Sequence, residues 1–210
     1  SLRLMPVVSF DDPDESEESR RRKDDFILAQ CNVMVRGWEV RHYDDFLRYK
    51  KEFLELFAFL PEVERKVAPP LEKACGRLRI GIHVRRGDYA RWQAGKYLYS
   101  DRQYADVARK IVTMYPDRDI IFYVCGNDPA IDRDIYRDAV PESDFIFAEG
   151  NPGEDLCLLS HCDLLAGPPS TFSLLASAYR DIPLYWIKDP GTEITPSSFR
   201  RFNSLFREII

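Results

Sequence analysis

The sequence has no run of 18 or more consecutive apolar residues, and its first residues lack the basic and then apolar layout of a signal peptide. A membrane-spanning helix is therefore not expected. A surplus of positive charge is also missing, because 30 lysines and arginines stand against 35 acidic residues. A chain with this balance has no general field that would hold nucleic acid through its phosphates, so any site for an anion must be local.

Cysteine pairs are missing as well. The five cysteines are an odd number and include no C-x-x-C pair, which disfavours both a disulfide framework and a zinc site. We expect all five to be buried thiols of a protein from a reducing compartment. They are Cys31, Cys75, Cys125, Cys157 and Cys162.

What is present is an ordinary globular composition, with 45% apolar and 31% charged residues over 210 positions. This length suits one full domain plus an accessory piece. Residues 11–25 form a polar block without an aromatic or aliphatic side chain, so we expect a partly disordered linker over residues 1–25. Its Asp12-Pro13-Asp14 matches a D-x-D pattern that can hold a divalent cation, but a loop lacks the rigid strand end that fixes such ligands.

Residues 26–75 are predicted to form a partial strand-and-helix segment. The apolar run over 26–35 favours a strand that ends at Gly37. Over 45–60 the apolar side chains recur close to every 3.6 residues, which predicts a helix with one packed face. Three prolines are then expected to break the chain: Pro61, Pro69 and Pro70.

Beyond Gly76, short apolar runs alternate with helical patterns. Strands are predicted over 78–84, 120–125, 145–148, 163–167 and 183–187. Helices are predicted between them, and Ser100 with Gln103 forms a capping box for the first. Such alternation predicts an α/β fold, namely a Rossmann-type doubly wound parallel sheet over residues 76–210. Ligands of these sheets bind beyond the carboxyl ends of the strands.

Two arginines follow the first predicted strand, in the string His83-Val84-Arg85-Arg86-Gly87-Asp88-Tyr89. Adjacent guanidinium groups repel each other unless each has an anionic partner, and the planar fork of arginine fits phosphate oxygens. Two interpretations stay open. Arg85 and Arg86 bind a phosphate, or they pair with local acids such as Asp88.

A second segment that favours an anion links the fourth predicted strand to its helix. It reads Gly167-Pro168-Pro169-Ser170-Thr171-Phe172-Ser173. Ser170 and Thr171 can cap the helix, whose first N–H groups and positive dipole end attract an anion. Ordinary capping explains this segment alone, whereas a diphosphate that bridges it and the arginines would explain both.

Four segments, in this order, resemble the α1,2-fucosyltransferase family and, more distantly, the α1,6- and protein-O-fucosyltransferases. They are residues 83–89, 123–128, 154–162 and 170–173. The H-x-R-R-G-D-Y string is the most specific of them. The resemblance covers roughly residues 37–187, with Gly37-Trp38 and a helix over 43–53 fitting the family only loosely.

The resemblance implies a GT-B-like pair of Rossmann-type halves, of which residues 76–210 would be the carboxyl-terminal half that binds the nucleotide sugar. The donor would be GDP-fucose and the acceptor a glycan, expected to be a galactoside. Transfer would invert the configuration at the anomeric carbon of the fucose and would need no metal ion or other cofactor. The implied location is the cytoplasm of a bacterial-type cell, or the Golgi lumen if an amino-terminal anchor has been removed.

The resemblance also assigns roles to single residues. Arg85 would be catalytic, because it would bond the β-phosphate and neutralise charge on the leaving GDP. The other residues implied to bind GDP-fucose are His83 facing the nucleotide, Arg86 supporting the loop through a carboxylate, Asp155 reading the guanine edge, and Ser170 and Thr171 on phosphate oxygens. Simpler roles remain open for two of them, since His83 can be a core histidine and Asp155 an acid at a helix start.

One part of the family pattern is missing. The 210 residues contain no Gly-rich turn of the type G-G-L-G-N-Q, and they show no convincing base for the proton of the acceptor hydroxyl. Either a missing amino-terminal half or a partner subunit supplies these parts, or the chain is a catalytically inactive GDP-sugar-binding module with a regulatory or scaffolding role.

Overall fold

A five-stranded parallel sheet forms the centre of the computed structural model, which describes residues 5–12, 14–37 and 42–208. The strands are β3 (Leu78–Val84), β4 (Ile120–Gly126), β5 (Asp144–Phe147), β6 (Leu164–Gly167) and β7 (Leu184–Trp186). Their spatial order is β5-β4-β3-β6-β7, with every neighbouring pair parallel. The predicted Rossmann-type sheet is therefore confirmed, and its strand order reverses beside β3.

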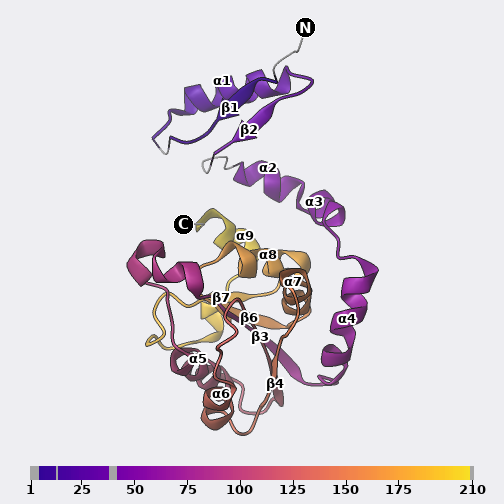
Figure 1. The fold of residues 1–210 in the computed structure, drawn as a ribbon, viewed down its shortest axis with the longest axis vertical. Coiled ribbons are helices and arrows are strands. Elements are labelled where there is room, and N and C mark those ends of the chain that lie inside the picture. The colour runs from indigo at the N-terminus through magenta and orange to yellow at the C-terminus, as the bar shows by residue number, and fades with distance from the viewer. Residues whose placement is uncertain (1–4, 13, 38–41, 209–210) are drawn as a thin grey trace. The chain divides into compact units, whose positions relative to one another are not determined.

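Helices cover both faces of this sheet (Figure 1). They are α5 (Asp101–Met114), α6 (Arg133–Ala139), α7 (Pro152–Ser160) and α8 (Thr171–Arg180). Ile80 and Ile82 of β3 share a buried cluster with Tyr104 of α5. A Cβ added at Gly81, between them, would lie 2.7 Å from Leu159 of α7. Because side chains alternate along a strand, α5 and α7 lie on opposite faces.

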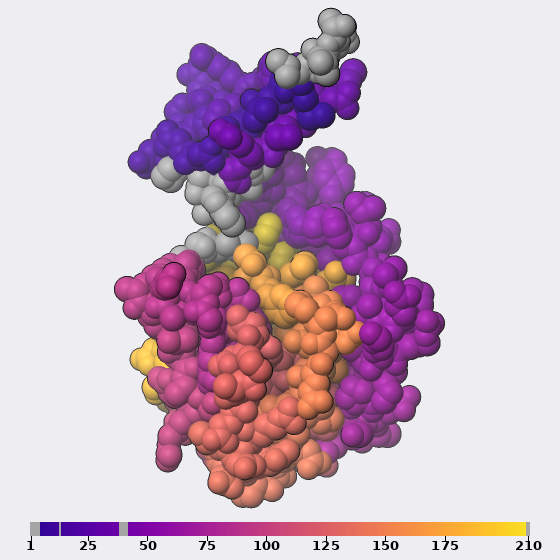
Figure 2. Space-filling view, viewed as in Figure 1, coloured from indigo at the N-terminus to yellow at the C-terminus, as the bar shows by residue number. Residues whose placement is uncertain are grey.

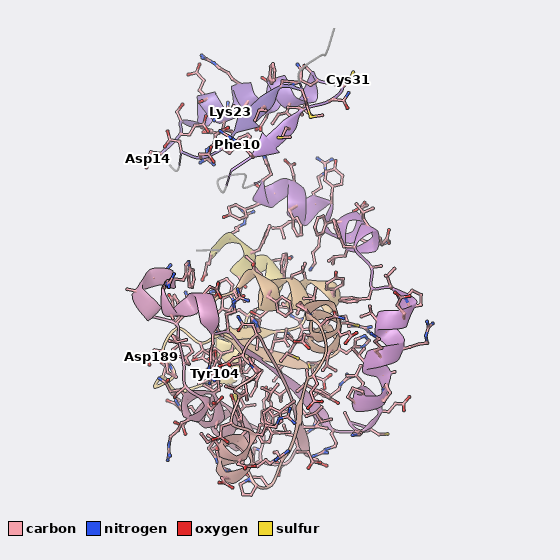
Figure 3. All side chains as sticks on the ribbon, viewed as in Figure 1. Phe10, Asp14, Lys23, Cys31, Tyr104 and Asp189 are labelled. Carbon is pink, nitrogen blue, oxygen red and sulfur yellow. The ribbon has the colours of Figure 1, made fainter. Side chains whose placement is uncertain are left out.

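The predicted start of α5 is confirmed in detail. Ser100 Oγ accepts from the backbone N–H of Gln103, and the Gln103 side chain bonds the backbone N–H of Ser100 in return. Tyr104 follows directly and is fully buried (Figure 3). The space-filling view shows one face of this part of the chain, where the surface is formed by residues coloured from magenta to orange (Figure 2).

The chain divides into two compact units, Ser1–Lys50 and Lys51–Ile210. In the first unit, residues 17–25 of the polar block belong to a helix, α1 (Glu17–Leu28), where a linker was predicted. Ser16 caps the helix, and two ion pairs at i, i+4 spacing, Glu17–Arg21 and Glu18–Arg22, run along its exposed side. The alternating charges thus stabilise a solvated helix.

The strand predicted over 26–35 is also corrected, because α1 extends to Leu28 and only β2 (Met34–Arg36) is a strand. It pairs in parallel with β1 (Val7–Ser9), so the unit is a small β-α-β element. Phe10 is buried beneath Lys23, whose ammonium lies 5.0 Å from the ring centroid (Figure 3).

The D-x-D segment forms a local turn in which the Asp14 N–H donates to Oδ1 of Asp12 at 2.9 Å. Pro13 between them and Trp38, which fitted the resemblance, lie outside the described residues.

The helix predicted over 45–60 is two shorter ones, α2 (Tyr43–Arg48) and α3 (Lys50–Leu56). The prolines after it do not break the chain but belong to α4 (Pro61–Glu72). Pro61 takes the first turn, where its missing N–H costs nothing. Pro69 and Pro70 fall near the end of α4, and the Pro70 carbonyl accepts from the Tyr123 hydroxyl of β4 at 2.8 Å.

Two of the five cysteines depart from the prediction. Cys31 and Cys75 are exposed, whereas Cys125, Cys157 and Cys162 are buried, and all five are free thiols. Among the described residues, no helix is both long enough and apolar enough to cross a membrane.

Candidate active site

A cavity of about 640 Å³ lies beyond the carboxyl ends of β3, β4 and β5. Three residues predicted from the sequence line it, namely His83, Arg85 and Asp155, together with Phe172 from α8. Its volume is in the range of small-molecule sites. It also lies at the sheet edge where doubly wound folds bind their ligands.

Two glycines let the strand ends approach each other at this edge. A Cβ added at Gly126 would lie 2.7 Å from the carbonyl oxygen of Val84, and one at Gly167 would lie 2.9 Å from that of His83. Neither distance leaves room for a side chain. The ends of β4 and β6 therefore fit against β3 because these two positions are glycine.

Arg85 presents its guanidinium to the cavity. The group donates to Oδ2 of Asp88 at 2.9 Å, and the two side chains are 32% and 58% exposed. An ion pair with this much solvent contributes about 0–1 kcal/mol. An anionic ligand can therefore compete with Asp88. The pairing of Arg85 with Asp88 is confirmed, and its contact with a phosphate stays a prediction.

Arg86 points away from the cavity into a network of acids. Its guanidinium donates to Asp101 at 2.7 Å, to Asp128 at 3.1 Å and to the backbone carbonyl of Tyr99 at 3.1 Å. Asp101 also accepts from the Tyr136 hydroxyl at 3.1 Å. The geometry agrees with support of the loop through carboxylates. Each guanidinium nitrogen has a protein partner and Arg86 does not line the cavity, and its direct contact with the donor stays a prediction.

Asn127 is a residue that sequence reasoning did not single out. Its Oδ1 accepts from the backbone N–H of Arg86 at 2.9 Å, and its Nδ2 donates to the Arg86 carbonyl at 3.1 Å. The amide thereby joins the loop after β4 to the loop after β3. Its position directly after β4, at the same edge of the sheet, was the available signal.

His83 is a buried, neutral imidazole at the cavity. Burial and the charge of Arg85 lower the pKa of His83 to about 3, so the ring carries no charge near neutral pH. It packs against the Phe172 ring at 5.0 Å between centroids. Its buried Nδ1 has no hydrogen-bond partner among the described residues. A neutral imidazole can donate one hydrogen bond and accept another, which suits an uncharged polar part of a ligand.

Asp155 lies in the first turn of α7, whose start is fixed by a capping box of Asn151 and Glu154. Burial and the neighbouring charge of Glu154 raise the pKa of Asp155 to about 6. Within the described part of the chain, its buried Oδ1 also lacks a hydrogen-bond partner. Buried polar atoms are normally satisfied, so an unpartnered carboxylate oxygen beside a cavity favours a ligand that donates hydrogen bonds.

The Ser170 turn lies next to the Arg85 loop, because β6 and β3 are neighbours. Ser170 caps α8 by accepting from the Phe172 N–H at 3.2 Å, while Thr171 is exposed. Of these three residues, Phe172 lines the cavity, and Ser170 and Thr171 do not. The Tyr89 hydroxyl donates to the carbonyl of Pro169 at 2.5 Å and joins the two segments.

Comparison with known protein families assigns the part of the chain that forms the sheet and the cavity to one family. The family model for Glycosyl transferase family 11 matches residues 75–181, which is just over half of the sequence and includes every predicted site residue. The chain belongs to this family. The resemblance to α1,2-fucosyltransferases is thereby confirmed.

The family 11 chain is also similar to a solved structure, the glycosyl transferase family 9 from Veillonella parvula DSM 2008. The identity is 13% and the TM-score is 0.41. The match covers 60% of this chain and 35% of that one, so this chain spans about a third of its length. No curated protein matches the sequence.

Metal-ligand atoms come together elsewhere in this family 11 protein, between α4 and α7. Donor atoms of Glu64, Cys157 and His161 lie within 4.8 Å of one another. Nε2 of His161 is 2.9 Å from the Glu64 carboxylate and 3.3 Å from the guanidinium of Arg180. Because a cation already lies beside the nitrogen that would bind a metal, the group is best described as a polar contact between helices.

Proposed function

We propose that this protein binds GDP-fucose in the cavity and transfers the fucose to a hydroxyl group of a sugar acceptor, expected to be a galactoside. The observation that carries the proposal is the contrast within one cavity. The cavity is lined by Arg85, whose guanidinium has only an exposed pair with Asp88, and by Asp155, whose buried Oδ1 has no hydrogen-bond partner among the described residues. A guanine nucleoside diphosphate has the matching chemistry, because its diphosphate is anionic and its base carries N–H donors.

The position of each end supports this orientation of the donor. Arg85 follows β3 next to the turn that starts α8, where the helix dipole favours negative charge. Asp155 lies in the first turn of α7, where its carbonyl is 4.0 Å from Sγ of Cys125 in β4, and β4 lies on the other side of β3 from β6. The diphosphate would lie by Arg85, and the guanine would donate its N–H groups to Asp155.

Catalysis in this proposal is stabilisation of the leaving group. When the bond from fucose to the β-phosphate breaks, negative charge grows on the GDP oxygens. A preorganised guanidinium and a helix start placed at those oxygens lower the energy of that state without a proton transfer. His83 is neutral, so it adds no positive charge near the guanine that would compete with the guanine N–H groups for Asp155. Inverting transfer without a metal ion follows as the expected chemistry.

A binding module without transfer activity is the second candidate. It is favoured by the missing G-G-L-G-N-Q turn and by the acids along the cavity. Asp128 and Glu149 are held in ion pairs with Arg86 and Arg133, and Asp155 is assigned to the guanine base. A base for the acceptor would then have to come from residues outside this chain or from a partner.

Two measurements test the proposal. Calorimetric titration with GDP, ADP and UDP is expected to show the tightest binding for GDP, with a matching rise in Tm. Release of GDP from GDP-fucose is then measured with a panel of galactosides, with and without EDTA, and is expected to be insensitive to the chelator. Equal affinity for the three nucleotides would overturn the donor assignment, whereas tight GDP binding without turnover would favour the module.

A further inference from the structure

Tyr89 touches both segments that are proposed to hold the diphosphate. It belongs to the short 3-10 helix Gly87–Ala90 that follows the two arginines, and it is only 6% exposed. The centre of its ring lies 5.6 Å from the guanidinium carbon of Arg85. Its hydroxyl donates to the carbonyl of Pro169, the residue before the cap of α8.

The ring of Tyr89 limits where the Arg85 guanidinium can lie. Among the described residues, the ion-pair partner of that guanidinium is the exposed carboxylate of Asp88. A guanidinium over an aromatic face gains a modest attraction, and the face restricts its orientation. The ring itself is held from another side by Trp92, at 4.7 Å between centroids. Arg85 therefore rests on a surface that is itself fixed.

The hydroxyl of Tyr89 fixes the other segment. It is 2.5 Å from the Pro169 carbonyl, and the Ser170 side chain is within hydrogen-bonding reach. Burial raises the pKa of Tyr89, against the opposing effect of Ser170, so the phenol remains a donor across the physiological range. A shift of the Ser170 turn would accordingly move the ring on which Arg85 rests.

We propose that Tyr89 is a positioning residue that sets the distance between the Arg85 guanidinium and the start of α8, and thereby the fit to a diphosphate. This inference rests on the proposed function, since it assigns the diphosphate to that gap. It predicts a selective effect: loss of the hydroxyl weakens ligands that contain a diphosphate and leaves the nucleoside part unaffected.

The test compares Tyr89→Phe with Tyr99→Phe. Tyr99 is a matched control, because its hydroxyl also donates to a backbone carbonyl, that of Ile187 at 2.8 Å. That hydroxyl contacts neither segment, and Tyr99→Phe leaves the backbone carbonyl that accepts from Arg86 in place. Affinities for GDP, inorganic pyrophosphate and guanosine are measured by calorimetry, and folding of both variants is checked by Tm. We expect Tyr89→Phe to weaken GDP and pyrophosphate roughly 3- to 10-fold, the size of one hydrogen bond. Guanosine should bind as in the wild type, and Tyr99→Phe should change none of the three.

Several outcomes would overturn the inference. One is a Tyr89→Phe variant that binds pyrophosphate as well as Tyr99→Phe does, and another is an equal loss of guanosine and GDP. If Tyr89→Phe fails to fold while Tyr99→Phe folds, Tyr89 is a structural residue and the inference is wrong. Wild-type protein that binds pyrophosphate but not GDP contradicts the proposed donor and leaves the Tyr89 comparison readable with pyrophosphate. Failure of the two proposals is thus distinguished.

Discussion

Arg85 and Arg86 are neighbours in the sequence, yet they belong to two regions of opposite character. Arg86 enters a network between the β3 loop, α5 and the β4 loop, in which its guanidinium bonds both Asp101 and Asp128. Arg85 lines the cavity, where buried atoms of His83 and Asp155 have no hydrogen-bond partner within the ranges that the structure describes.

The difference separates groups that stabilise the fold from groups that await a ligand. A buried charge in a fully paired network is costly to disturb, because its partner is left uncompensated. A buried polar atom without a partner lowers stability until something binds it. Mutations in the Arg86 network should therefore mainly lower the free energy of unfolding, and mutations at the cavity should mainly lower the affinity for a ligand.

The largest expected effect is in the network. Arg86→Ala would leave Asp101, which is 8% exposed, without its cation, and we expect a loss of about 3–5 kcal/mol in the free energy of unfolding. Denaturant unfolding followed by circular dichroism measures it. Arg91→Ala, at an exposed arginine of the same loop, is the control and should change stability little. A loss below about 1 kcal/mol for Arg86→Ala would break the comparison.

The next effect is at the cavity. Arg85→Ala is expected to weaken GDP by about 1.5–3 kcal/mol, or roughly 10- to 150-fold, because a charge-assisted contact to phosphate is lost. The Tm of the ligand-free protein should stay close to that of the wild type, since the exposed pair with Asp88 contributes little. Calorimetry with GDP and a thermal melt without ligand give both values. Unchanged affinity in this variant would remove Arg85 from the donor site.

Asp155→Asn should move stability and binding in opposite directions. The pKa of Asp155 is raised to about 6 in the folded chain, so the stabilisation that comes from its proton is lost as the pH rises through 6. At pH 7.5 the neutral amide should therefore raise the free energy of unfolding, by roughly 1 kcal/mol at this partly exposed site, or about 2–4 °C in Tm. The same change should relax the preference for GDP over ADP. A lower Tm, or an unaltered preference, would contradict the assignment.

The smallest effect is a pH dependence of binding. If the ionised Asp155 accepts from guanine, the affinity for GDP should fall roughly fourfold between pH 7.5 and 5.5, as the carboxyl with a pKa of about 6 takes up its proton. GDP titrates in this range too, so the dependence of Asp155→Asn is subtracted. Equal pH profiles for the two proteins would show that this carboxyl does not contact the base.

The sequence predicted the sheet well because its signals are local and repeated. Each strand from Leu78 onward is a short apolar run, and the Ser100–Gln103 box marks a helix start by chemistry that acts over three residues. The amino-terminal errors have a common origin. The charged residues at the start of 17–28 suggest a solvated linker, but the i, i+4 spacing of Glu17 and Arg21 favours a helix. Pro69 and Pro70 suggest a break, but they are tolerated because they fall near the end of α4.

From the residues alone, the site was predictable by residue type but not by direction, and it was the family resemblance that assigned Arg85 to a phosphate and Arg86 to support of the loop. Arg85 and Arg86 are equivalent in the string, and which of them faces the cavity depends on Asp101 and Asp128, which come from distant segments. The role of Asn127 was hidden for the same reason, since it bonds backbone groups that lie 41 positions away. Exposure of Cys31 and Cys75 likewise follows from tertiary packing.

Gly126 and Gly167 have a consequence for how such a site can diversify. With backbone atoms of β3 under 3 Å from where a side chain would start, the three central strand ends cannot be altered without lifting His83 and Arg85 out of place. Under the proposed function, new donor preferences are therefore expected in the connection between β5 and α7 (residues 148–151), which lines the cavity away from these two glycines.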